Sequence, residues 1–186
     1  MIARPRLSLL WPHRRTRLKI LHFVLFPLAL FFTIFDAGDN LPATAGVLRF
    51  TSILALIFVT AATVMTFDAM LHGMASRPGP KLPPWARRVH WWLHRALVVM
   101  VALVPVLGLV IGLTASRQLW AGGIVPIGVP FSLPRLNYVV GEVHAVQFYL
   151  LSALIGAHVL FNLWRHYWLR DNALRIIAPK RWHKYL

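Results

Sequence analysis

The chain alternates between long apolar stretches and shorter polar connections. Four stretches contain no Asp, Glu, Lys or Arg, and a bilayer core of about 30 Å needs helices of about this length; they are residues 20–35, 50–67, 96–116 and 143–164. The first stretch is short, but its helix can begin earlier if Lys19 extends its charged end back to the interface. This pattern predicts an all-α integral membrane protein.

We expect four helices in one antiparallel transmembrane bundle, a single domain over residues 1–186. The predicted helices cover residues 19–36, 45–71, 89–114 and 139–168, and a short amphipathic helix follows over residues 172–177. The longest connection, residues 117–138, is rich in Gly and Pro. We expect it to cap one end of the bundle.

The distribution of charge predicts the orientation of the bundle. The net charge is +15, and seventeen of the twenty Lys and Arg residues fall within residues 4–19, 77–95 and 165–184. With four crossings these three segments share one side of the membrane, which the positive-inside rule identifies as cytoplasmic. We therefore expect both termini to be cytoplasmic and the basic residues to contact anionic lipid rather than nucleic acid.

Two histidines in the last apolar stretch suggest a cofactor. His144 and His158 are fourteen residues apart, which corresponds to roughly 21 Å along a helix and to directions within about 40° of each other. Ionisable side chains inside a membrane are costly and usually face a functional site. The spacing suits two stacked haems, each taking one axial ligand from this helix.

The absence of cysteine limits the kind of cofactor. The sequence contains no Cys, which excludes disulfides, iron–sulfur clusters held by thiolates, and haem linked through thioethers. Any haem is therefore bound non-covalently, through histidine or methionine.

Other histidines lie near the predicted cytoplasmic ends of the helices. His22 is in the first helix, and His90 and His94 are four residues apart in the third. His94 could contact a quinone head group or a haem propionate, or it could be an interfacial anchor beside tryptophans. His166 could similarly face the edge of an inner haem or a quinone.

Three charged residues near the same ends have simpler expected roles. Asp68 could pair with Arg95 or relay protons to a reduced quinone. Arg165, like Arg170, is expected to meet lipid phosphates or haem propionates.

Several segments together resemble the prokaryotic cytochrome b561 family of four-helix membrane haem b proteins. The tail pattern is the most specific of them: Glu142-Val143-His144, then His158, then residues 166–179 with Asp171-Asn172 and Pro179. The other matching segments are Arg17 to Phe23, His94 with residues 102–109, and the glycine-rich loop 123–130.

The resemblance implies a function and a set of ligands. It implies haem b electron transfer between the quinone pool and a partner or a small oxidant or reductant, with superoxide oxidation linked to quinone as one possible activity. It also implies that His22 and His158 hold an inner haem, and that His144 holds an outer one. The alternatives are a haem b anchor subunit of a hydrogenase or dehydrogenase complex, or a structural subunit that has lost one or both haems.

The chain departs from the family at the second outer ligand. The second helix has no histidine near its outer end, and Arg49 aligns best with the missing one. Because arginine stays protonated in proteins, it does not normally ligate iron. Three outcomes remain open: the outer haem is absent, it is five-coordinate on His144, or its sixth ligand comes from elsewhere. If the site is empty, Arg49 could pair with Glu142; if it is filled, Arg49 and Arg135 could bind propionates.

Overall fold

The computed structural model describes residues 13–35, 44–116, 118–127, 131–178 and 182–185. Its four long helices are α1 (Arg14–Ile34), α2 (Ala45–His72), α3 (Pro84–Thr114) and α4 (Pro134–Tyr167), and a short helix α5 (Ala173–Ile177) follows. All four long helices are long and apolar enough to cross a membrane. The predicted all-α, four-helix membrane fold is therefore confirmed.

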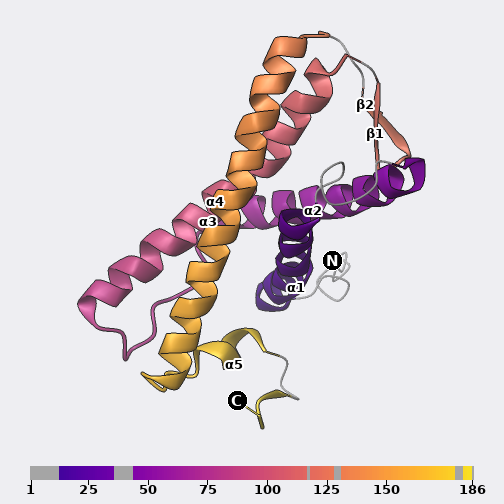
Figure 1. Cartoon of the computed structure of the whole chain (residues 1–186). Coiled ribbons are helices and arrows are strands. Elements are labelled where there is room, and N and C mark those ends of the chain that lie inside the picture. The colour runs from indigo at the N-terminus through magenta and orange to yellow at the C-terminus, as the bar shows by residue number, and fades with distance from the viewer. Residues whose placement is uncertain (1–12, 36–43, 117, 128–130, 179–181, 186) are drawn as a thin grey trace, which may run out of the picture.

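The four long helices pack around one apolar core. Figure 1 shows α3 and α4 running in opposite directions and crossing, with α2 lying across them and α1 against α2. The core contains Phe58, fully buried at 1% exposure, with Ala62 and Leu151. Phe58 contacts Phe32 and Phe148 with ring centroids about 6 Å apart, which joins α1, α2 and α4.

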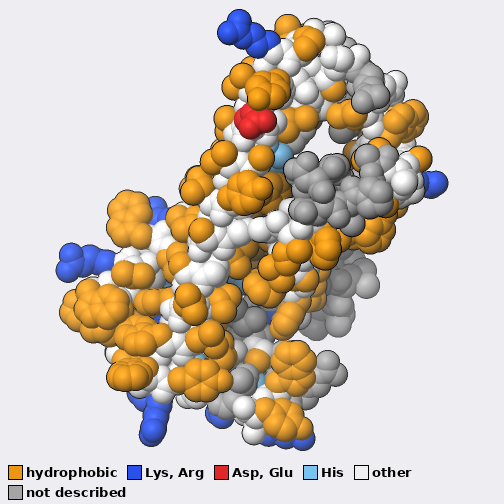
Figure 2. All heavy atoms as spheres, viewed as in Figure 1, with side chains coloured by type: hydrophobic (Ala, Val, Ile, Leu, Met, Phe, Trp, Pro, Cys, Tyr) orange, Lys and Arg blue, Asp and Glu red, His pale blue; other side chains and the backbone are white. Residues whose placement is uncertain are grey.

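Most apolar side chains point outward. Figure 2 shows hydrophobic side chains over most of the visible face, while the visible Lys and Arg side chains lie toward its ends. Exposed apolar residues are found on all four long helices, for example Phe26, Phe67, Val99 and Leu160. Such a surface is unfavourable in water but suited to lipid.

Three helices begin earlier than the sequence predicts. α3 begins at Pro84 and α4 at Pro134, each five residues before the expected position. Proline is favoured in the first turn of a helix, because its φ is already helical and the N–H that it lacks would be unpaired there. α1 likewise begins at Arg14, so its first turn is basic.

The two ends of the bundle differ, and we name them by their connections. At the loop end, residues 73–83 join α2 to α3. At the hairpin end, two short strands, β1 (Leu119–Ala121) and β2 (Val125–Ile127), pair antiparallel between α3 and α4. The prediction did not include these strands.

Asp68 joins α1 to α2 at the loop end. Its carboxylate accepts hydrogen bonds from Arg14 Nε at 2.8 Å and Arg17 Nη2 at 3.1 Å, and its side chain is only 8% exposed. Arg14 also donates to the carbonyl of Gly73, just beyond the end of α2. The expected pairing of Asp68 with Arg95 was therefore wrong: Arg95 instead lies over the ring of Trp91.

Replacing Asp68 with asparagine is expected to destabilise the protein by about 2 kcal/mol, because two cations lose the anion that receives their hydrogen bonds. Unfolding in detergent, followed by circular dichroism, measures this. Glu142→Gln is the matched control, because Glu142 is exposed and forms no ion pair within the described residues. Equal stability of the two variants would contradict the prediction.

A second ion pair lies between α4 and α5. Arg165 donates to Asp171 at 2.8 Å, and the two side chains are 3% and 1% exposed. Asp171 also accepts from the backbone N–H of Ala173 at 3.0 Å, at the start of α5. Arg165 is thus committed to a buried carboxylate, so the expectation that it meets lipid phosphates was wrong. Contact of Arg165 with a haem propionate stays a prediction.

Candidate functional site

Three helices bring three histidines together near the loop end. His22 comes from α1, His94 from α3 and His158 from α4; we call them the histidine cluster. The rings of His94 and His158 meet edge to face with centroids 4.8 Å apart. His22 interacts electrostatically with both. Residues far apart in the sequence therefore share one site.

Backbone hydrogen bonds orient two of these rings. His22 Nδ1 lies 2.8 Å from the carbonyl oxygen of Leu18, and His94 Nδ1 lies 2.8 Å from that of His90. Because a carbonyl oxygen can only accept, Nδ1 carries the proton in each ring and Nε2 keeps its lone pair. The same arrangement orients histidine ligands in metal sites.

His158 is held differently. Asn162, one turn later on α4, donates to the backbone carbonyl of His158 at 2.8 Å, and its amide nitrogen lies 3.2 Å from Nε2 of the ring. All three cluster side chains are half-buried. The cluster therefore offers imidazole nitrogens in a largely apolar setting.

The donor set of this cluster fits a b-type haem. A b-type haem with two histidine ligands takes one imidazole on each face of the porphyrin, and the cluster offers histidines from three different helices. Among the described residues, no group of three or more His, Cys, Asp or Glu side chains could hold a bare metal ion. Histidine pairs are thus the ligand chemistry that the site can supply.

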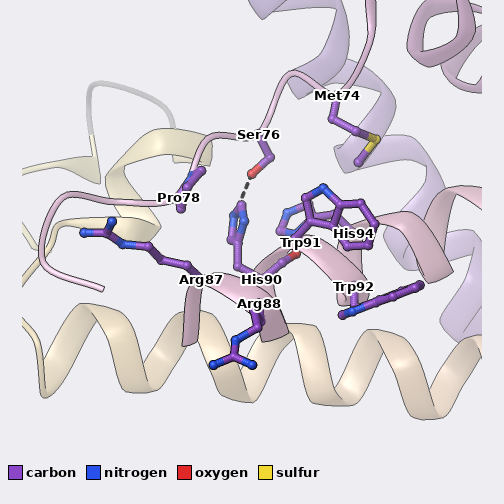
Figure 3. Close-up of a pocket in the computed structure, with 9 residues that line it drawn as sticks. All are labelled: Met74, Ser76, Pro78, Arg87, Arg88, His90, Trp91, Trp92 and His94. Atoms are coloured by element: carbon purple, nitrogen blue, oxygen red, sulfur yellow. Dashed lines mark hydrogen bonds between the residues drawn. The ribbon is translucent and has the colours of Figure 1, made fainter. Parts of the chain in front are cut away.

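A fourth histidine extends the cluster toward the loop. His90 is buried at 2% exposure, and its ring lies 4.2 Å from that of His94 between centroids. Figure 3 shows Ser76 of the loop pointing at His90, and Ser76 Oγ lies 3.0 Å from His90 Nε2. Sequence reasoning found the spacing of His90 and His94 but missed the contact between His94 and His158.

His166 lies two turns beyond His158 on α4. Its side chain is buried, its ring meets that of Tyr167 edge to face at 5.0 Å, and its Nδ1 has no hydrogen-bond partner among the described residues. None of its described contacts joins it to the histidine cluster. A role for His166 beside a haem or a quinone stays a prediction.

The structure does not bring the two outer candidates together. His144 Nδ1 donates to Oε1 of Gln147 at 2.9 Å, and Gln147 in turn donates to the backbone carbonyl of Met100 on α3 at 2.8 Å. Gln147 is thus the hydrogen-bond partner of His144.

Arg49 lies beneath the β1–β2 hairpin. A Cβ added at Gly123, in the turn, would lie 3.0 Å from Arg49 Cγ. Nearby, Ser52 Oγ donates to the carbonyl of Trp120 and accepts from the N–H of Gly122, each at 2.7 Å. The hairpin thus covers the end of α2, and no ion pair forms between Arg49 and Glu142.

The residues at the hairpin end do not fit a haem with two histidine ligands. Within the described part of the chain, α2 carries a single histidine, His72, and it lies at the loop end. His144 is therefore the one histidine among the described residues near the hairpin end.

No protein-family model matches the chain, and a search of curated proteins finds no match. The resemblance to the cytochrome b561 family therefore depends on the sequence segments quoted above.

Proposed function

We propose that this protein is a membrane electron-transfer protein that holds one haem b at the histidine cluster. It exchanges electrons between the quinone pool and a partner or a small oxidant or reductant. The observation that carries the proposal is the convergence of His22, His94 and His158 from three apolar helices. The Nδ1 of His22 is bonded to a backbone carbonyl, so its Nε2 keeps the lone pair that a ligand needs.

His22 and His158 are the proposed axial ligands, and haem supplies the one-electron chemistry when bound. With both imidazoles bound, the iron would have no open coordination position, which would favour electron transfer without binding of oxygen. The Nδ1 bond of His22 to a carbonyl makes that ring a more basic ligand. His94 lies against His158 and is proposed to orient its ring.

One haem is proposed rather than two. Arg49 stands where the family resemblance would put the second ligand at the hairpin end, and the hairpin packs on Arg49. His144 is already bonded to Gln147. Electron transfer is therefore proposed to concentrate near the loop end. We propose that this end lies on the cytoplasmic side of a bacterial inner membrane, and the excess of Lys and Arg in residues 4–19, 77–95 and 165–184 supports this orientation.

His144→Ala is expected to leave the haem content of the purified protein unchanged. In this proposal His144 binds Gln147 and not iron. A pyridine haemochrome assay with protein quantitation measures the ratio. Two haems per chain in the wild type, falling to one in the variant, would show that the hairpin end binds haem and would overturn the proposal of a single haem.

The function is tested on the detergent-purified chain. We expect about one haem b per chain, and we expect the absorption spectrum of reduced haem to appear when a quinol is added. Protein free of haem would overturn the proposal and favour a structural subunit. Haem that no quinol reduces, in a preparation that retains a stoichiometric partner protein, would favour an anchor subunit of a larger complex.

A further inference from the structure

A pocket of about 330 Å³ lies where the loop over residues 73–83 passes the first turns of α3. Figure 3 shows Met74, Trp91 and Trp92 on one side of His90 and Arg87 on the other. Arg88 also lines the pocket. The pocket therefore has an aromatic, apolar part and a cationic part.

The lining of this pocket is cationic. None of its lining residues is acidic, and the first turn of α3 contains no acidic residue. Asp171 interacts electrostatically with His90 of the lining, but its carboxylate is paired with Arg165. The N-terminus of a helix carries partial positive charge, so the arginines here add to it instead of neutralising it. Within the described residues, Arg88 forms no hydrogen bond or ion pair, whereas Arg87 donates through Nε to the carbonyl of Leu82.

The pocket lies at the membrane boundary. The loop joins two helices of membrane-crossing length, so it must emerge where they leave the apolar core. Trp91 and Trp92 are 46% and 65% exposed, and Arg95 lies 3.9 Å above the ring of Trp91. Tryptophan beside arginine is the arrangement found at the level of lipid head groups.

We propose that this pocket binds the phosphodiester head group of an anionic phospholipid. The arginines supply donors and charge for the phosphate, and the tryptophans and Met74 contact the glycerol and the upper acyl chain. Basic pockets between membrane helices on the cytoplasmic side recognise such head groups. The apolar walls favour a lipid over free phosphate, and the cations favour it over a neutral quinone. The pocket is also lined by His94 of the histidine cluster, but the proposed lipid contacts do not use His94, so the proposal does not require bound haem.

The test is native mass spectrometry of the full chain in detergent, titrated with phosphatidylglycerol or with phosphatidylcholine of the same acyl chains. We expect the first phosphatidylglycerol to bind several-fold more tightly. Arg88→Gln is expected to lower that affinity by about fivefold, the effect of one basic residue near an anionic lipid. Arg88→Lys keeps the positive charge and is expected to retain most of the affinity for phosphatidylglycerol.

Arg15→Gln is the matched control. Arg15 is an exposed arginine in the first turn of α1, at the same end of the bundle, and it does not line the pocket. Its replacement removes the same charge and is expected to leave phosphatidylglycerol binding nearly unchanged. Circular dichroism confirms that each variant is folded.

Three results would overturn the proposal. Equal affinity for the two lipids would mean that the pocket does not distinguish an anionic head group from a zwitterionic one. An equal loss of phosphatidylglycerol affinity in Arg88→Gln and Arg15→Gln would mean that binding depends only on the overall charge of the protein. Displacement of bound lipid by glycerol phosphate or by a short-chain quinone would assign the pocket to a soluble phosphate or to a quinone.

Discussion

His158→Ala is expected to lower the haem content of the purified protein by more than about tenfold, because it removes a proposed axial ligand. Loss of a residue that only hydrogen-bonds a metal ligand already lowers metal affinity by about tenfold or more, and loss of the ligand itself should cost more. His158 is the member of the histidine cluster in ring contact with His94, and it also interacts electrostatically with His22. Its removal leaves no histidine from α4 in the cluster. The pyridine haemochrome assay, normalised to protein, measures the loss.

His72→Ala is the control for that experiment. His72 is also a histidine near the loop end, but its side chain is 52% exposed and lies beside Asp68. It is expected to keep the wild-type haem content. His94→Ala should bind haem with an altered spectrum, since His94 is proposed to orient a ligand. Full haem content in His158→Ala would exclude the proposed ligand pair even if the wild type binds haem.

The number and type of the helices could be read from the apolar stretches alone, because a bilayer requires continuous apolar residues of a fixed length. The starts of α3 and α4 could not, because each helix begins before its apolar stretch, and the first turn of α3 contains the charged Arg87 and Arg88. Pro84 and Pro134 carry the signal that was missed. The hairpin pairs only three residues per strand, too few for an alternating pattern to predict.

The candidate site was partly predictable for a similar reason. The basic clusters indicate which helix ends share a side, and this places His22, His94 and His158 at one depth. Contact between His94 and His158 depends on how α3 and α4 are rotated and crossed, which no local pattern encodes. By contrast, the bond from His144 to Gln147 spans three residues of one helix and could have been expected from spacing.

The buried ion pair between Arg165, on α4, and Asp171, just before α5, contacts the loop over residues 73–83. Its partners are almost completely enclosed, and the loop packs on them: a Cβ added at Gly79 would lie 2.7 Å from Asp171 Oδ2 and 2.9 Å from Arg165 Nη2. Lys81 of the same loop donates to the backbone carbonyl of Arg170 at 2.9 Å. Glycine at this position lets the backbone approach the two charges.

Asp171→Ala is accordingly expected to destabilise the protein by about 3–5 kcal/mol, because it leaves the Arg165 guanidinium buried without a counter-charge. It also leaves the N–H of Ala173, at the start of α5, without its carboxylate partner. Unfolding in detergent followed by circular dichroism measures the change. Glu142→Ala removes the same charge from an exposed position on α4, so a similar loss in both variants would show that the ion pair contributes little.

Gly79→Ala tests the packing of the loop separately. It keeps both charges, and it is expected to destabilise the fold only because the added Cβ displaces the Asp171 and Arg165 side chains.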